Sequence, residues 1–298
     1  KEIKRVRNHC LCTFVFKQFN HYAYYLIISA AVSAVLMLTA ERKWQKVLFA
    51  VTMFTSVLTL VINDTFGCQL AALAGLVFIC LIFSLSKSGF RLKYLAPVAV
   101  FLAAFGTGML TSDELRLRTI CNFDGSNYNI MVYYGRTPEG EPFNIEGTTK
   151  RVTDDQEERY FGGSAAGVTG SASRLTLWKY GLSYVLEEPI MGHGPDMTSG
   201  RMFADSNFEN ERCHCEYLNY AISFGIPAAL LYIAAIVYVY ISGLKYRKKL
   251  TPVQLTGLGA AMFYLISAVI GNSMYYTSPF MFILLGMGYY RQSKDTSD

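Results

Sequence analysis

The stretch RCHCEYLNYAISFGIPAALLYI, residues 212–233, joins a polar part of the chain to a strongly apolar one. It places His214 between two cysteines, adds Glu216, and then continues into residues 217–241, which contain no charged side chain. An apolar run of this length predicts a transmembrane helix, because about 20 residues cross the hydrocarbon core of a bilayer. The rest of the fold depends on how many further runs of this kind the chain contains.

Six more apolar runs share this character, and several of them gain a turn from flanking Tyr, Thr and Ser. The seven predicted spans are 22–40, 47–62, 69–85, 95–110, 217–241, 253–270 and 279–290. Only 16% of the residues are charged, whereas soluble domains carry about 25%. The sequence therefore predicts an all-α polytopic membrane protein with about seven transmembrane helices.

Basic residues predict how these spans are oriented. Twelve of the 27 Lys and Arg residues fall in four short segments at every second span boundary, 41–46, 86–93, 243–249 and 289–294. The positive-inside rule places such segments in the cytoplasm. Residues 111–215, which hold sixteen of the 22 acidic residues, then form one large extracytoplasmic loop domain carrying amphipathic helices. It separates an N-terminal membrane part, 1–110, from a C-terminal membrane part, 216–298.

The N-terminal segment KEIKRVR, residues 1–7, is basic although the alternation of spans places it outside. We expect residues 1–20 to be an outer loop that follows earlier spans lying before residue 1. The alternative is a cytoplasmic N-terminus followed by a re-entrant stretch at 10–19. No cleavable signal peptide is apparent, because polar residues and Lys17 interrupt the first apolar stretch.

The sequence SASRLTLWKYGLSYVLEEP, residues 171–189, predicts an ordered helix within the loop domain. Ser171 or Ser173 is a suitable N-cap, and the helix should end before Pro189. The apolar residues at helical spacing are Leu175, Trp178, Leu182, Val185 and Leu186. We expect this amphipathic helix to lie along the membrane surface. Arg174 shares a face with Trp178. Without further information, it is a lipid-headgroup contact or a surface charge at the N-terminus of the helix.

The next segment, MGHGPD at 191–196, contains Gly192, Gly194 and Pro195 and predicts a tight turn. Taken alone, the pattern Gly-His-Gly-Pro is too weak to indicate a phosphate-binding loop.

The segment Cys213-His214-Cys215 allows three interpretations. A zinc site needs three or four converging ligands, whereas adjacent side chains diverge, and the chain has no CxxC or HxxxH motif to complete a ligand set. A disulfide between Cys213 and Cys215 would be strained, and the seven scattered cysteines give no disulfide framework. The position favours an acid–base group, because a free imidazole titrates at about pH 6.5 and can accept a proton from a hydroxyl. The alternative is a histidine at headgroup level without a function.

Two segments together resemble the signature region of the O-antigen ligase and polymerase family. They are SRLTLWKYGLSYVLEEPIMGHGPDM at 173–197 and HCEYLNYAISFGIPAALLYI at 214–233. The family pattern begins with a helix that carries Arg and Trp, followed by a Pro-apolar-apolar-Gly-x-Gly turn. It continues with His-Asn-x-Tyr-Leu and ends with Gly-apolar-apolar-Gly/Ala at the start of a transmembrane span. Weaker similarity covers FNHYAYYL at 19–26, NDTFGCQLA at 63–71 and the last two spans.

This sequence departs from the family pattern at two places. The sequence DTFG at 64–67 stands where family members often have Ser-Arg-Gly, so one family arginine has no counterpart there. Cys215 stands where the family has an asparagine after its histidine.

The resemblance implies a metal-independent glycosyltransferase, without a cofactor, in the bacterial inner (cytoplasmic) membrane. Its donor would be a polyprenyl-pyrophosphate-linked saccharide, and its acceptor a hydroxyl of a glycan or a lipid core on the outer face. Arg174 would bind the pyrophosphate, and His214 would activate the acceptor, with Glu216 or Asp196 orienting it. Further contacts to phosphate or sugar would come from Arg212, Arg201, Trp178, Gly192 and Gly194. The expected partners are these substrates and membrane lipids, with no nucleic acid.

Two other classes of protein compete with this interpretation. A non-catalytic transporter or flippase for lipid-linked saccharides would need charged residues inside its spans, but Asp64 lies at the end of a span and Glu216 at the mouth of one. A sensor or scaffold with an outer domain would give no reason for the Arg174 helix and the His214 segment to converge.

Overall fold

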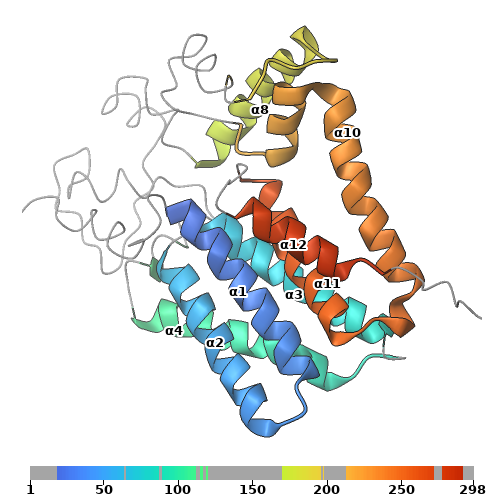
Figure 1. Cartoon of the computed structure of the whole chain (residues 1–298). Helices are drawn as coiled ribbons and strands as arrows, with labels where there is room; N and C mark the ends of the chain where they lie inside the picture. The colour runs from blue at the N-terminus through green and yellow to red at the C-terminus, as the bar shows by residue number, and fades with distance from the viewer. Residues whose placement is uncertain are drawn as a thin grey trace, which may run out of the picture.

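The computed structural model describes residues 19–63, 65–86, 89–111, 115–116, 119, 170–195, 197, 213–271 and 277–290. Every regular element in this part of the chain is helical, as the sequence predicts (Figure 1). The elements are α1 (Phe19–Thr39), α2 (Lys43–Ile62), α3 (Phe66–Ser86), η2 (Leu92–Leu95), α4 (Ala96–Thr111), α8 (Gly170–Glu187), α10 (Glu216–Lys245), η4 (Arg247–Lys249), α11 (Pro252–Ala268) and α12 (Ser278–Gly288).

Each of the seven predicted spans corresponds to a helix, but the helices differ in length. Five helical segments of the described chain are long and apolar enough to cross a membrane. They are α1, α2, α3, the continuous segment Leu92–Thr111 formed by η2 and α4, and α10. The remaining two, α11 with 17 residues and α12 with 11, are shorter than a perpendicular span requires. The structure therefore supports five membrane-spanning helices directly. Two further apolar helices pack among them.

Helix α11 lies at the centre of the bundle. Twelve of its 17 residues are buried, so it is enclosed on most sides rather than on one face. It packs against α1, α3 and α12, while α2 packs against α1 and α4 farther out (Figure 1). A methyl group on Gly257 would meet the backbone of α12 at Gly288, and one on Gly259 would lie 3.0 Å from Val35. Small residues of this kind let membrane helices approach closely.

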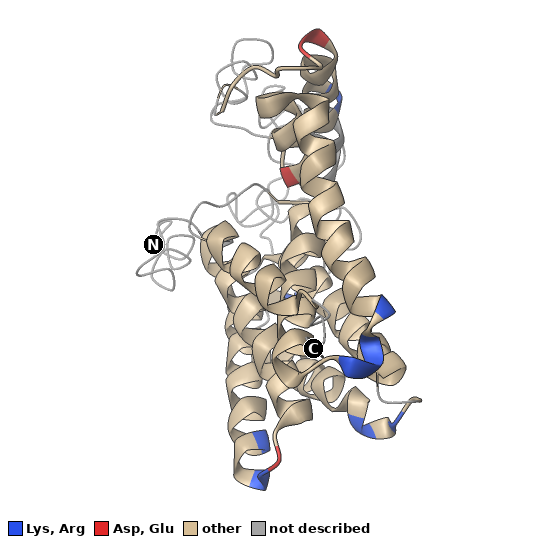
Figure 2. Ribbon diagram, turned by 45° about the vertical axis from the view of Figure 1, so that its right-hand side comes forward, with Lys and Arg blue, Asp and Glu red and all other residues tan. Residues whose placement is uncertain are grey.

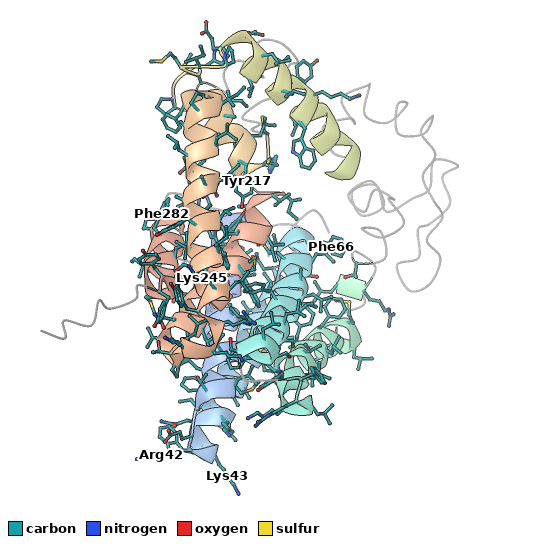
Figure 3. The ribbon with its side chains drawn as sticks, turned by 90° about the vertical axis from the view of Figure 1, so that its right-hand side faces the viewer. Arg42, Lys43, Phe66, Tyr217, Lys245 and Phe282 are labelled. Atoms are coloured by element: carbon teal, nitrogen blue, oxygen red, sulfur yellow. The ribbon has the colours of Figure 1, made fainter. Side chains whose placement is uncertain are left out.

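Basic residues gather at one end of the bundle. In the described part of the chain, Lys and Arg lie mostly at the end away from α8 (Figure 2). Arg42 and Lys43, at the start of α2, are at this end (Figure 3). The loop helix α8 and the part of α10 that contacts it lie at the opposite end (Figure 1).

Helix α10 is not the single straight helix that the sequence predicts over 217–241. It is broken at Gly225, whose φ of 83° and ψ of 166° are open essentially to glycine alone. A first arm, residues 216–224, and a second arm, residues 226–245, fold back on each other as a helical hairpin (Figure 1). The second arm spans about 30 Å at 1.5 Å per residue, enough to cross the hydrocarbon core.

The break leaves backbone groups without helical partners. Pro227 has no N–H to offer the carbonyl oxygen of Ser223. The N–H of Ile226 turns away from the first arm and donates to the carbonyl oxygen of Pro189 over 2.8 Å. A buried backbone group without a partner is costly, so the freed carbonyls need donors from elsewhere.

The turn that follows α8 supplies these donors. The N–H of His193 donates to the oxygen of Ile222 over 2.7 Å, and the N–H of Gly194 donates to the oxygen of Ser223 over 3.0 Å. Gly192, with a φ of 70°, lies so close to the break that a Cβ atom there would be 2.6 Å from the Ser223 carbonyl carbon. The described part of the predicted turn, residues 191–195, is therefore the backbone partner of the hairpin.

We expect Gly225→Ala to destabilise the protein by at least about 1–3 kcal/mol, from backbone strain alone. The added methyl group would also overlap the carbonyl group of Ile190. Thermal unfolding of the detergent-solubilised chain measures this loss. Gly106→Ala in α4 is the matched control, because nothing lies within 4 Å of the new methyl group. Equal melting temperatures for the two variants would contradict the account of the break.

Candidate functional site

Helix α8 packs through one face onto the first arm of α10. Leu177, Tyr184 and Val185 are buried, whereas Leu182 and Leu186 are 55% and 69% exposed. The apolar stripe expected from the sequence is therefore only partly correct, because the buried face is set by contact with the hairpin. Helix α8 ends at Glu187, before Pro189 as predicted, but it begins at Gly170. Ser171 and Ser173 therefore lie inside the helix, and the predicted N-cap is wrong.

The contact between α8 and the first arm is close because Gly181 has no side chain. A Cβ atom on Gly181 would collide with Sγ of Cys213 and would lie 2.9 Å from Leu218. Cys213 is fully buried and forms a small apolar core with Leu177 and Ile222, among others. We refer to Leu177, Tyr184, Val185, Cys213 and Ile222 as the loop cluster.

The two cysteines beside His214 are free thiols. Burial raises the pKa of the Cys213 thiol to about 12, and the neighbouring Cys215 thiol adds to the shift. Burial also raises the pKa of Cys215. Cys213 is thus a neutral packing residue of the loop cluster. Among the described residues, no group of three or more His, Cys, Asp and Glu is arranged to hold a metal ion.

His214 has an uncommon backbone conformation. Its φ of 47° makes it the one non-glycine residue with positive φ in the described part of the chain. His, Asn and Asp enter this left-handed region more readily than other side chains. His214 is half-buried and lies two residues before the start of α10 at Glu216, as the sequence predicts.

Glu216 is fully buried at the start of the first arm. Its Oε1 accepts a hydrogen bond from the hydroxyl of Tyr232 over 2.8 Å, and its Oε2 accepts one from Tyr264 over 2.8 Å. The hydroxyls of Tyr264 and Ser278 are 2.7 Å apart. The hydrogen bonds of Glu216 join the two arms of the hairpin to α11, and the contact between Tyr264 and Ser278 extends the network to α12.

Aromatic rings fill the space between the two arms. Tyr220 stacks on Tyr232 with ring centroids 4.3 Å apart and an interplanar angle of 9°. The ring centroids of Tyr217 and Tyr232 are 6.2 Å apart. The hydroxyl of Tyr217 donates to the carbonyl oxygen of Leu265 over 2.9 Å. In Figure 3, Tyr217 lies where the hairpin meets the membrane bundle.

The tyrosines that contact Glu216 were not predicted from the sequence. Tyr232 is sixteen residues from Glu216, and the two could not meet along an unbroken helix. The available signal was Gly225-Ile226-Pro227, because Gly and Pro are the strongest breakers of regular structure. Tyr264 belongs to a different helix, and only tertiary packing brings it to the carboxylate.

The other predicted site residues are described to different extents. Gly192 and Gly194 form the turn on the hairpin, and Trp178 is half-buried on α8. The backbone at position 174 belongs to α8, but the Arg174 side chain lies outside the described part of the structure. Asp196, Arg201 and Arg212 also lie outside the described residues.

The fold and the comparison with known families agree on the class of protein. A bundle with five helices able to cross a membrane defines an integral membrane protein. The family model described as O-antigen ligase matches residues 50–233, more than half of the chain. The chain belongs to the O-antigen ligase family, which has a membrane glycosyltransferase-like role in polysaccharide biosynthesis. No curated protein and no solved structure matches the chain.

We expect Cys213 to resist alkylation by maleimide in the folded protein. Its raised pKa keeps the thiol neutral between pH 6 and 9, and only the thiolate is a strong nucleophile. The measurement is labelling at pH 8 of a variant that keeps Cys213 as its one cysteine, before and after denaturation. A variant that keeps Cys215 instead is the control, and it should react faster because Cys215 is only half-buried. Equal rates would contradict the packing role of Cys213.

Proposed function

We propose that the chain transfers a saccharide from a polyprenyl pyrophosphate to a hydroxyl acceptor on the outer face of the bacterial inner membrane. The acceptor is a glycan or a lipid core. Arg174 binds the pyrophosphate, and His214 accepts the proton of the attacking hydroxyl. The observation that carries the proposal is the close packing of α8 against the chain around His214, through Gly181 and Cys213.

The distribution of charge supports an outer-face site. Arg42 and Lys43 precede α2, Arg91 and Lys93 lie between α3 and α4, and residues 245–249 contain four basic residues. The described Lys and Arg gather mostly at the end of the bundle away from α8 (Figure 2). By the positive-inside rule this end faces the cytoplasm. The α8 end, with position 174 and His214, then faces outward.

The helical register supports a role for Arg174 beside His214. Positions 174, 177 and 181 are three and seven residues apart, so they share one face of α8. On this face, Leu177 belongs to the loop cluster, and Gly181 lies against Cys213 of the same cluster. A planar guanidinium binds phosphate oxygens bidentately and stays charged, which suits a pyrophosphate leaving group. The nearby N-terminus of α8 adds a partial positive charge.

The position of His214 supports its role as the base. It is half-buried, and it joins the loop cluster to the first turn of α10. In the proposed reaction the acceptor oxygen forms a bond to the anomeric carbon while the bond from that carbon to the pyrophosphate oxygen breaks. The acceptor proton moves to the imidazole, and the polyprenyl pyrophosphate leaves with the electron pair.

The remaining candidates surround this pair in the proposal. Arg201 and Arg212 add contacts to the phosphates, and Asp196 contributes a carboxylate. Gly192 and Gly194, whose turn packs on the hairpin, place this part of the backbone beside the substrate. Trp178 faces the saccharide, and its indole N–H is a buried donor without a hydrogen-bond partner in the described structure. Such a donor is costly unless a ligand or water satisfies it.

We expect Arg174→Ala and His214→Asn each to reduce transfer by about 100-fold or more, because they remove a stabilising charge and a general base. The assay follows glycan transfer in membranes that contain the host's lipid-linked saccharides but lack the native chain. Asparagine tolerates the positive φ of His214 and keeps the local backbone. Lys179→Ala removes an exposed cation from the same helix and should retain activity. Wild-type transfer by either site variant would reject its assigned role.

We expect transfer to continue in the presence of EDTA, because the proposed reaction uses a guanidinium in place of a metal ion. The measurement compares initial rates in the same membranes before and after chelation. Loss of transfer that Mg²⁺ or Zn²⁺ restores would show that a metal takes part.

A further inference from the structure

His214 lies on a short segment that is anchored on both sides. Cys213, directly before it, is fully buried in the loop cluster against α8. Glu216, two residues after it, is fully buried against the membrane bundle. His214 itself is half-buried. Its position relative to the bundle therefore depends on what holds Glu216.

A hydrogen-bond network centred on one carboxylate joins four separate segments of the chain. Glu216 on the first arm accepts hydrogen bonds from Tyr232 on the second arm and Tyr264 on α11, each over 2.8 Å. Ser278, at the start of α12, lies 2.7 Å from the hydroxyl of Tyr264. In a continuous helix, sixteen residues would separate Glu216 from Tyr232 by about 24 Å. We refer to Glu216, Tyr232, Tyr264 and Ser278 as the carboxylate clasp.

The hydrogen bonds of the clasp offset part of the cost of burying the Glu216 carboxylate. Both oxygens of Glu216 accept from tyrosine hydroxyls, so Tyr264 in turn accepts from the hydroxyl of Ser278. Hydrogen bonds to a charged acceptor are roughly twice as strong as neutral ones. Glu216 also lies in the first turn of α10, where the free N–H groups favour negative charge.

The tyrosines of the clasp are themselves held in place. Tyr232 stacks on Tyr220 with ring centroids 4.3 Å apart. The rings of Tyr264 and Tyr24 pack edge to face with their centroids 5.1 Å apart, and Tyr24 donates its hydroxyl to the carbonyl oxygen of Ser267 over 3.0 Å. The carboxylate is therefore bound to rings that cannot turn without disturbing the packed helices around them.

We infer that Glu216 is a positioning residue, whose carboxylate clasp holds His214 at a set place over the membrane bundle. The inference rests on the proposed function, in which His214 is the base. Glu216 takes no part in bond making or breaking and acts through the two-residue link to His214. Catalysis needs the base within hydrogen-bonding distance of the acceptor hydroxyl, and a misplacement of about 1 Å can lower a rate about 100-fold.

We expect Glu216→Gln to lower kcat for transfer about 100-fold and to leave KM for the lipid-linked donor within about twofold of wild type. The amide keeps the shape of the side chain but cannot accept both tyrosine hydrogen bonds as a charged group does. Tyr264→Phe, which removes one of these bonds, should lower kcat about tenfold. The assay uses the full chain in membranes that contain the host's lipid-linked saccharides, with the donor concentration varied.

A double-mutant cycle separates positioning from general loss of stability. We expect Glu216→Gln and Tyr264→Phe together to lower kcat no further than Glu216→Gln alone, because both act on the same clasp. Tyr240→Phe is the matched control, since Tyr240 donates its hydroxyl from α10 to the carbonyl oxygen of Leu258 on α11 over 2.9 Å. It should lower the melting temperature and leave kcat unchanged.

The outcomes that would overturn the inference are distinct. A wild-type kcat in Glu216→Gln, while His214→Asn is inactive, would reject the positioning role and leave the proposed function standing. Independent effects of Glu216→Gln and Tyr264→Phe on kcat would also reject it. Wild-type transfer by His214→Asn would reject the proposed base and the positioning role together. If Glu216→Gln does not fold, Tyr264→Phe and Tyr232→Phe decide, because each removes only one hydroxyl.

Discussion

The arrangement of the candidate site depends on one constraint, which is that a broken helix beside a membrane must find partners for its freed backbone groups. The break at Gly225 exposes the carbonyls of Ile222 and Ser223. The N–H groups of His193 and Gly194 satisfy both of them. A helix end without such partners would cost several kcal/mol in an apolar environment. This requirement fixes the turn after α8 against the tip of the hairpin.

Because of the same break, the α10 hairpin contacts both the loop helix α8 and the membrane bundle. On one side, Gly181 lets α8 approach Cys213 closely. On the other side, Glu216 is bound by tyrosines that belong to the second arm and to α11. His214 lies between these two contacts, in a backbone conformation that few residues adopt readily. A residue held in this way is suited to act at a defined distance from a lipid-linked substrate.

The composition of α11 explains how so short a helix can organise the bundle. Its glycines at 257 and 259 let α12, α1 and α3 pack closely around it. Tyr217, Tyr240 and Tyr24 donate their hydroxyls to carbonyl oxygens along it. The interior combines small residues, large apolar side chains and tyrosine hydrogen bonds. Other large apolar side chains, such as Leu102 and Leu231, are exposed on the outside, where lipid replaces water. Membership of the O-antigen ligase family is consistent with this membrane-embedded design.

The sequence alone determined the helical class, the apolar runs, the loop helix and the positions of His214 and Glu216 at the start of α10. These features depend on local composition and periodicity, which a single chain displays directly. Tertiary structure alone decided that α10 folds back at Gly225, that the buried face of α8 includes Leu177 and Gly181, and that Glu216 meets Tyr232 and Tyr264. The physical reason is that these contacts join residues far apart in sequence. Their proximity follows from how helices pack and how freed backbone groups find partners, and neither leaves a periodic signal in the chain.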